Sequence, residues 1–174
     1  MEKKAIASFD IGIKNFAFYV EENDKPLSLR LLSLNNKSKE IDINTRKNLI
    51  LHLNEHKNLW DCCSVILIEQ QYTRRSSSNI TALKIAEDVI IWFLIEYPET
   101  EIISFSPKHK TSYLLGAPKK MTYHQRKKWS VSKALSLFNE KGYDVGLINQ
   151  YKKKDDICDC ILQTQAFKQF KNFN

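Results

Sequence analysis

The order of its short apolar segments constrains the fold of this 174-residue chain more than any other feature of the sequence. Three strand-like segments with short connections come first, which is typical of an antiparallel meander. Two further strand-like segments then alternate with helical patterns, as in proteins whose parallel strands are joined by helices. The expected strands cover residues 5–10, 16–21, 27–34, 65–69 and 101–105. The sequence therefore predicts an α/β fold in one domain, residues 1–174, with a five-stranded mixed sheet flanked by helices.

Helical periodicity accompanies these strands in four places. The expected helices cover residues 43–57, 81–97, 122–141 and 155–170, and loops or a broken helix are expected at 73–79 and 108–121. Asp42 is a candidate N-cap of the first helix, and Gly142 ends the third. The second helix is apolar almost all round in its second half. Such a helix needs cover on more than one side, which indicates either full burial in the core or a dimer interface.

Carboxylates occur at the ends of two buried strands and at the start of the last helix. Asp10 ends the first strand, and Glu69 ends the fourth. Asp156 and Asp159 are three residues apart and share one face of the last helix. Asp155 is an alternative partner, because it lies four residues before Asp159. An ionised carboxylate beside an apolar core is costly unless it is paired or bound to a metal.

Each of these carboxylates also has a structural interpretation. Asp10 could cap the turn before Gly12, and Glu69 could end its strand in solvent. Asp155 and Asp156 could simply complement the N-terminus of the last helix, where negative charge is favourable. Together they favour a metal site, since hard oxygen ligands suit Mg²⁺, with Mn²⁺ as a substitute. A cluster of three or four carboxylates can hold two cations about 4 Å apart, which is the arrangement that cleaves phosphodiesters.

The positive charge of the chain is clustered. The net charge is +7, and residues 102–139 contain eight Lys and Arg but no Asp or Glu. This clustering favours a polyanion such as nucleic acid over a merely solvated basic face. Candidate DNA contacts in or near this tract are Lys108, Lys110, Lys119, Lys120, Arg126, Lys127 and Lys128, and further candidates are Arg74 and Arg75 after Glu69, and Lys152, Lys153 and Lys154 before the last helix.

Other features exclude some classes of protein. No apolar run reaches the roughly 20 residues that a membrane-spanning helix needs, so no membrane partner is expected. The first residues lack the apolar stretch of a secretory signal, which predicts an intracellular protein. The four cysteines, Cys62, Cys63, Cys158 and Cys160, do not have common zinc spacings and are interpreted as small, reduced residues of the interior.

Three segments resemble the catalytic blocks of RuvC-type resolvases, in the RNase H-like (integrase-like) superfamily. The segment SFDIGIKNFAF resembles the first catalytic strand and turn, VILIEQQY the second catalytic strand, and KKKDDICDCIL the closing helix with its Asp-x-x-Asp pattern. The blocks occur in the family order with family-like spacing. Over essentially the whole chain, the sequence is similar to the poxvirus Holliday junction resolvases, and less so to fungal mitochondrial resolvases and bacterial RuvC.

This resemblance implies a structure-selective endonuclease with an RNase H-like fold. It implies that Asp10, Glu69, Asp156 and Asp159 hold two metal ions, and that paired nicks in a four-way DNA junction leave 5′-phosphates. It also makes Tyr72, three residues after Glu69, a candidate wedge at the branch point. Since a junction has approximate two-fold symmetry, a C₂ homodimer is expected.

Two other functions remain open at this point. The same fold could serve a hydrolase that acts on RNA–DNA hybrids, because fold alone does not fix function. The chain could also bind junctions without cutting them. If it is viral, the expected task is the resolution of branched or concatemeric DNA at replication sites in the host cytoplasm.

Overall fold

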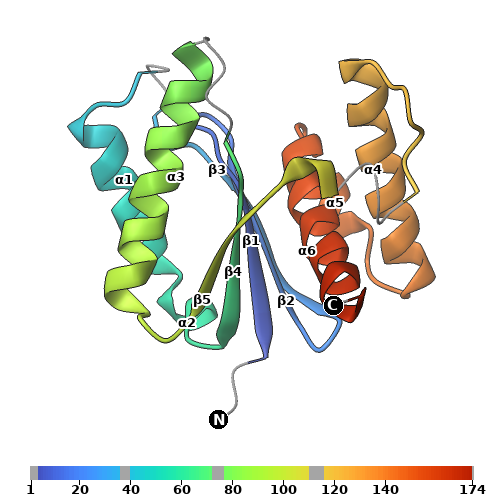
Figure 1. Ribbon diagram of the computed structural model, residues 1–174, viewed down its shortest axis with the longest axis horizontal. Helices are drawn as coiled ribbons and strands as arrows, with labels where there is room; N and C mark the ends of the chain where they lie inside the picture. Colours follow the sequence, from blue (N-terminus) through green and yellow to red (C-terminus); the bar gives the residue numbers. More distant parts are fainter. Residues whose placement is uncertain (1–3, 36–39, 72–76, 110–115, 174) are drawn as a thin grey trace.

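The computed structural model describes residues 4–35, 40–71, 77–109 and 116–173. A five-stranded sheet lies between two layers of helices (Figure 1). The strands are β1 (Ala5–Asp10), β2 (Phe16–Glu22), β3 (Lys25–Leu32), β4 (Cys63–Glu69) and β5 (Glu101–Phe105). The helices are α1 (Ile43–Glu55), α2 (Lys57–Trp60), α3 (Ser77–Glu96), α4 (Tyr123–Glu140), α5 (Gly146–Asn149) and α6 (Asp155–Phe173). This architecture confirms the α/β fold that the sequence predicts.

The sheet is mixed, with strand order β3-β2-β1-β4-β5. β1, β2 and β3 form an antiparallel meander, whereas β4 pairs parallel with both β1 and β5. β1 is therefore the central strand, and its carboxyl end lies at the same sheet edge as the carboxyl ends of β4 and β5. This edge is where the loops and helix ends that carry a site would meet.

The two faces of the sheet have separate apolar cores. On one face, α1, α2 and α3 cover Ala7, Phe9, Ile66 and Ile68, with the buried Trp60 at the centre of an aromatic cluster. On the other face, α4 and α6 cover a second cluster, which includes Leu67 and the fully buried residues Cys160, Ile161 and Leu162 of α6. Both faces of β4 are thus buried, which explains its almost continuous apolar sequence.

Local capping explains where the helices begin. Asp42 accepts a hydrogen bond from the Thr45 backbone N–H, and this capping box starts α1, as predicted. Thr122 and Gln125 form a second capping box at the start of α4. Gly142 follows α4 with a φ of 70°, a conformation that glycine adopts without steric cost.

Several predicted boundaries were wrong. β3 begins and ends two residues before the prediction of 27–34, and the helix predicted for 43–57 breaks at His56 into α1 and α2. α3 begins at Ser77, inside the segment predicted to be a loop. The prediction missed this first turn because its Ser-rich sequence has no apolar periodicity. The four-residue α5 was too short to predict. No helix within the described ranges is both long and apolar enough to cross a membrane.

Candidate active site

Asp10 and Glu69 are placed by the alternation of two adjacent parallel strands. Phe9 pairs with Ile68, so the next residue of each strand is a carboxylate. Ala7, Phe9, Ile66 and Ile68 face the α1–α3 side. Because successive side chains of a strand point to opposite faces, Asp10 and Glu69 both point to the side that α6 covers.

α6 adds two more carboxylates from above this face. Asp156 and Asp159 are three residues apart near its N-terminus, and Gln163 continues the same helix face. The Gln163 side chain donates to the Phe9 carbonyl at 3.5 Å, which fixes this face of α6 against β1 beside Asp10. The rotation of α6 is therefore set by packing on the central strand.

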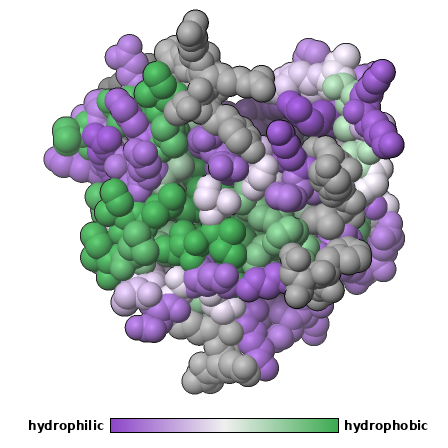
Figure 2. Space-filling view, in the orientation of Figure 1, coloured by the Kyte–Doolittle hydropathy of each residue, from purple (hydrophilic) through white to green (hydrophobic). Residues whose placement is uncertain are grey.

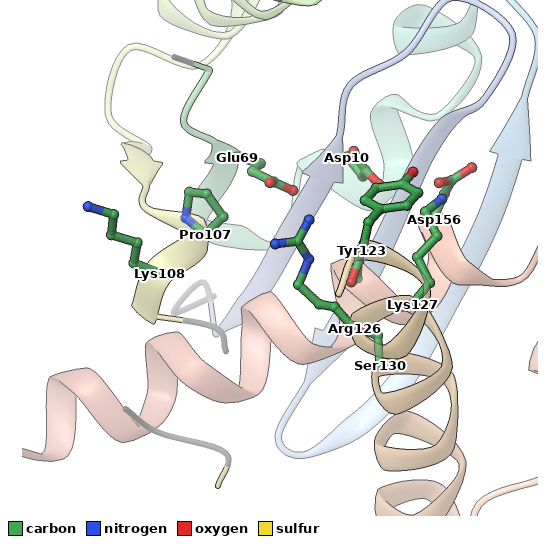
Figure 3. Close-up of a pocket in the computed structure, with 10 residues that line it drawn as sticks. Asp10, Glu69, Pro107, Lys108, Tyr123, Arg126, Lys127, Ser130 and Asp156 are labelled. Atoms are coloured by element: carbon green, nitrogen blue, oxygen red, sulfur yellow. The ribbon is translucent and has the colours of Figure 1, made fainter. Parts of the chain in front are cut away.

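The four carboxylates line one cavity of about 380 Å³ at the carboxyl edge of the sheet (Figure 3). They come from three segments far apart in the sequence. The remaining lining residues are Pro107, Lys108, Tyr123, Arg126, Lys127 and Ser130. The cavity thus combines an acidic floor with a wall of basic and aromatic side chains, mostly from the first turns of α4.

Asp155 and Asp156 have different surroundings. Asp156 lines the cavity, whereas Asp155 is absent from its lining and pairs with the Lys127 ammonium of α4. Burial opposes ionisation of Asp155, but the hydrogen bond and charge of Lys127 outweigh it and lower the pKa of Asp155. The structure therefore places Asp156, not Asp155, together with Asp10, Glu69 and Asp159.

Asp156 is a buried carboxyl group beside a lysine. Only 8% of the residue is exposed, and burial raises its pKa, with the Asp155 charge adding to the effect and Lys153 opposing it. The Lys153 ammonium lies 2.8 Å from Asp156 Oδ2, yet this oxygen makes no hydrogen bond of normal geometry within the described part of the chain. A buried carboxylate oxygen with spare acceptor capacity is suited to a cation.

The start of α4 lies against the acidic floor. The Thr122 capping box fixes the start of the helix, whose first five residues include Tyr123, Arg126 and Lys127. The Lys127 ammonium is 5.1 Å and the Arg126 guanidinium carbon is 5.6 Å from the centre of the Tyr123 ring. Burial lowers the pKa of Lys127, but its hydrogen bonds to Asp155 and Tyr123 raise it further than burial lowers it, so Lys127 stays charged.

The structure places the predicted DNA contacts in different surroundings. Lys108, Arg126 and Lys127 line the cavity, and Lys153 lies beside Asp156. Lys119, Lys120, Lys128 and Lys152 are exposed outside it, and Lys154 donates to the Asn149 side chain at 2.8 Å. Tyr72, Arg74, Arg75 and Lys110 lie outside the described residues.

Sequence reasoning missed several polar residues that line the cavities, among them Tyr123 and Lys14. Tyr123 lies inside the basic tract, three and four residues before Arg126 and Lys127, and this helical spacing was the available signal. Lys14 follows Gly12 in the turn after β1 and lines a neighbouring cavity. Gly12 is required there, since an added Cβ would lie 2.9 Å from the Asn15 carbonyl oxygen.

The donor set suits hard divalent cations. Four carboxylates in one cavity offer the oxygen ligands that Mg²⁺ and Mn²⁺ prefer, and Asp156 Oδ2 has spare acceptor capacity. In residues 4–35, 40–71, 77–109 and 116–173, no three His, Cys, Asp or Glu side chains converge closely enough to form a ready ligand cluster. The residues therefore fit a metal by their chemistry, and side-chain rotation would be needed to close the ligand set.

Solved structures share this fold. The yeast mitochondrial Holliday junction resolvase Ydc2 aligns with a TM-score of 0.67 and 17% identity, over 99% of this chain and 84% of that protein. Thermus thermophilus RuvC in complex with a Holliday junction substrate aligns with a TM-score of 0.66 and 12% identity, over 96% of each chain. These likenesses confirm the fold expected from the resemblance to RuvC-type enzymes.

Sequence relatives cover nearly the whole chain. Protein 97L of Invertebrate iridescent virus 3, described as uncharacterized, is 27% identical over 209 residues, covering 94% of this chain and 98% of the relative. Protein 170L of Invertebrate iridescent virus 6, also described as uncharacterized, is 30% identical over 221 residues, covering 94% and 88%. The profile of the poxvirus A22 protein family matches residues 4–167. The chain therefore belongs to the poxvirus A22 protein family.

Proposed function

We propose that this protein is a Holliday junction resolvase, a metal-dependent endonuclease that makes paired symmetric nicks in four-way DNA junctions. Its family and its fold support this function. Ydc2 is a Holliday junction resolvase, and the RuvC structure holds a Holliday junction substrate. The expected task is the resolution of branched or concatemeric viral DNA where it forms in the infected cell.

One observation carries the proposal: four carboxylates from β1, β4 and α6 line a single cavity whose wall is basic. A purely structural role would not gather four carboxylates around one cavity, because like charges brought together repel one another unless cations balance them. A phosphodiester substrate and divalent cations would balance this charge. The cationic wall of Lys108, Arg126 and Lys127 gives the DNA backbone a place beside the acidic floor.

Asp10, Glu69, Asp156 and Asp159 are the residues that would hold the metal, which we expect to be two Mg²⁺ ions, with Mn²⁺ as a substitute. When bound, such ions lower the pKa of a water for in-line attack on phosphorus and stabilise the departing oxygen. Lys127 is held beside the site by Asp155 and stays charged, so it can neutralise a phosphate oxygen. Arg126 and Lys108 extend the same contact along the strand.

A homodimer is part of the proposal. A four-way junction has two equivalent strands to cut, and the single four-carboxylate cavity among the described residues of each chain would need a second copy for the second cut. α3 offers an interface, because Ile91, Leu94 and Ile95 are 55%, 55% and 70% exposed. Apolar residues gather on this side of the molecule (Figure 2). Both interpretations of the apolar helix therefore have support, since Ile85 and Phe93 on its other side are fully buried.

The direct test is cleavage of a mobile four-way junction in Mg²⁺, with a matched duplex and an RNA–DNA hybrid as control substrates. Asp10→Asn keeps the size of the side chain and removes its charge, and Asp144→Asn, at an exposed site near α5, is the control variant. We expect wild type and Asp144→Asn to cut the junction and Asp10→Asn to lose cutting. Cleavage of the hybrid alone would instead show a ribonuclease, and binding without cutting in Mg²⁺ or Mn²⁺ would show a non-catalytic binder.

A further inference from the structure

Two cavities meet at the carboxylates. Beside the first cavity lies a second, of about 520 Å³, in the range of sites that hold small molecules or single nucleotides. Both cavities share Asp10, Tyr123, Lys127 and Asp156. The second is also lined by Ile11, Gly12, Ile13, Lys14, Asn15, Thr81, Ala82 and Lys153. Tyr123 is therefore the aromatic residue at the boundary between the two spaces.

Tyr123 is firmly held at its backbone and open at its side chain. It is the first residue of α4, directly after the capping residue Thr122. The Tyr123 residue is 56% exposed, although it lines both cavities together with Asp10 and Asp156 (Figure 3). An exposed ring over an acidic site contributes little to the core, so packing alone does not explain its position.

The second cavity has the chemistry of a nucleotide subsite. Lys14 and Lys153 offer ammonium groups for a phosphate, and Asn15 offers an amide. Gly12 and Ala82 keep part of the wall small. A cavity with three lysines, no acidic lining residue besides the two shared carboxylates and an aromatic edge matches one nucleotide of a DNA strand better than it matches an apolar ligand.

We propose that the second cavity receives the nucleotide that flanks the scissile phosphate, and that Tyr123 stacks on its base. This proposal rests on the proposed nuclease function and adds a substrate-positioning residue to it. A strand that runs from the second cavity to the first would carry its linking phosphate past Asp10 and Asp156. Because every base has a π-face, stacking would position the strand without fixing its sequence.

The competing explanation is that Tyr123 only supports Lys127, whose ammonium lies 5.1 Å from the ring centre. In that case, the loss of Tyr123 would weaken catalysis by the same factor on any substrate. In the stacking account, the loss would depend on the presence of the flanking base. An abasic substitution in the junction separates the two accounts.

The experiment measures single-turnover cleavage of a junction with one strong cut site, either intact or abasic at the nucleotide on each side of the cut. On the intact junction we expect Tyr123→Leu to be slower by about 5- to 100-fold, and Tyr123→Phe to stay within about threefold of wild type because the ring is retained. At one of the two abasic positions, the removal of the base should slow wild type by a similar factor. On that abasic junction, Tyr123→Leu should be no more than about twofold slower than wild type, because the base on which Tyr123 would stack is already gone.

Equal loss for Tyr123→Leu on the intact and on both abasic junctions would overturn the stacking proposal and leave the nuclease function standing. Failure of wild type to cut the intact junction would instead overturn the proposed function, and the stacking proposal with it. Thermal unfolding of each variant separates a folding defect from a loss of stacking. Because the Tyr123 ring is exposed at a helix start, its substitution should shift the melting temperature by no more than a few degrees, on the order of the shift for other surface substitutions.

Discussion

At the residue scale, Asp155 and Asp156 show how two neighbouring carboxylates acquire different roles. Asp155 is bound to Lys127, while Asp156 lines the cavity with a raised pKa. Their positions differ by one step along the helix, about 100° of rotation. That step separates a residue that holds a lysine from one that we propose holds metal.

Exchange of each carboxylate for its amide should separate these roles. We expect Asp156→Asn to slow junction cleavage by about 10²- to 10³-fold, because it removes a charge from the acidic floor. Asp155→Asn should cost about tenfold, because it only loosens Lys127. The measurement is single-turnover cleavage at saturating Mg²⁺. Equal losses for the two variants would contradict the assignment of Asp156 as the ligand.

Asp156 should also cost the free protein stability at neutral pH. Burial raises the pKa of its carboxyl above the value in the unfolded chain, so ionisation is less favourable in the folded state. The stability that protonated Asp156 provides is complete below the unfolded pKa and is lost as the pH rises through the folded pKa. We therefore expect metal-free Asp156→Asn to melt at the same temperature as wild type or up to about 3 °C higher at neutral pH.

The same reasoning fixes the pH dependence. The advantage of Asp156→Asn in free energy of unfolding should shrink as the pH falls below the raised pKa toward the ordinary aspartate range, because wild-type Asp156 is then also neutral. Urea unfolding of both proteins across this pH range, with chelator present, measures it. A wild type that is more stable at neutral pH and loses that lead on acidification would show that the Lys153 pair outweighs burial.

At the element scale, the first turn of α4 carries much of the basic wall. The capping box of Thr122 and Gln125 orders the turn that holds Tyr123, Arg126 and Lys127. α1 begins with an equivalent box at Asp42, on the opposite face of the sheet (Figure 1). The two caps make a matched pair, one beside the site and one remote from it.

Removal of each cap should therefore affect stability and activity differently. Thr122→Ala should cost about 1 kcal/mol of stability. It should also slow cleavage at temperatures where the protein is fully folded, because the wall of the cavity frays. Asp42→Ala should lower the melting temperature and leave the cleavage rate of the folded protein unchanged. Calorimetry measures the melting temperature of each variant. Single-turnover rates are then compared at about 20 °C below that temperature, a margin about three to five times the expected shift, so that every variant is fully folded. Equal effects on rate would show that α4 does not position the substrate.

Some elements could be predicted from the sequence and others could not. Asp10 and Glu69 end strands of unmistakable apolar pattern, so their meeting at one sheet edge follows from strand alternation. Asp155 and Asp156 could not be distinguished, because the rotation of α6 is set by contacts such as Gln163 with the Phe9 carbonyl. The spacing of Tyr123 to Arg126 and Lys127 places the three on one side of α4, but that Tyr123 shares a cavity with Asp10 depends on how α4 packs on α6, which no local pattern encodes.

At the scale of the whole molecule, the carboxylate cavity and the exposed apolar residues lie on different parts of the fold. The α4–α6 side carries the cavity, and α3 on the other side exposes Ile91, Leu94 and Ile95. The first half of α3 carries Thr81 and Ala82, which line the second cavity, whereas the exposed apolar residues lie in its second half. We propose that two copies associate through this second half, so that the site of each copy remains accessible to DNA. This separation of functions is what a pair of coordinated cuts requires.

Charge placed on the exposed face of α3 should separate the copies. Leu94→Lys is expected to give a monomer of 20.4 kDa in sedimentation, where wild type should have twice that mass. Leu147→Lys, at a 37% exposed leucine on α5 across the sheet, is the control and should remain dimeric. The dimer would be contradicted if wild type sedimented as a monomer at micromolar concentration both in the free state and when bound to junction DNA.

The central claim is that the four-carboxylate cavity makes paired cuts in a four-way junction. The most direct measurement is the digestion of a supercoiled plasmid with an extruded cruciform, by wild type and by Asp10→Asn, in Mg²⁺. Two coordinated nicks across the junction give a linear product, whereas one nick gives a relaxed circle. The account predicts linear plasmid from wild type as the first product and neither product from Asp10→Asn. Linear product from Asp10→Asn at the wild-type rate would contradict the claim, as would relaxed circles alone from wild type.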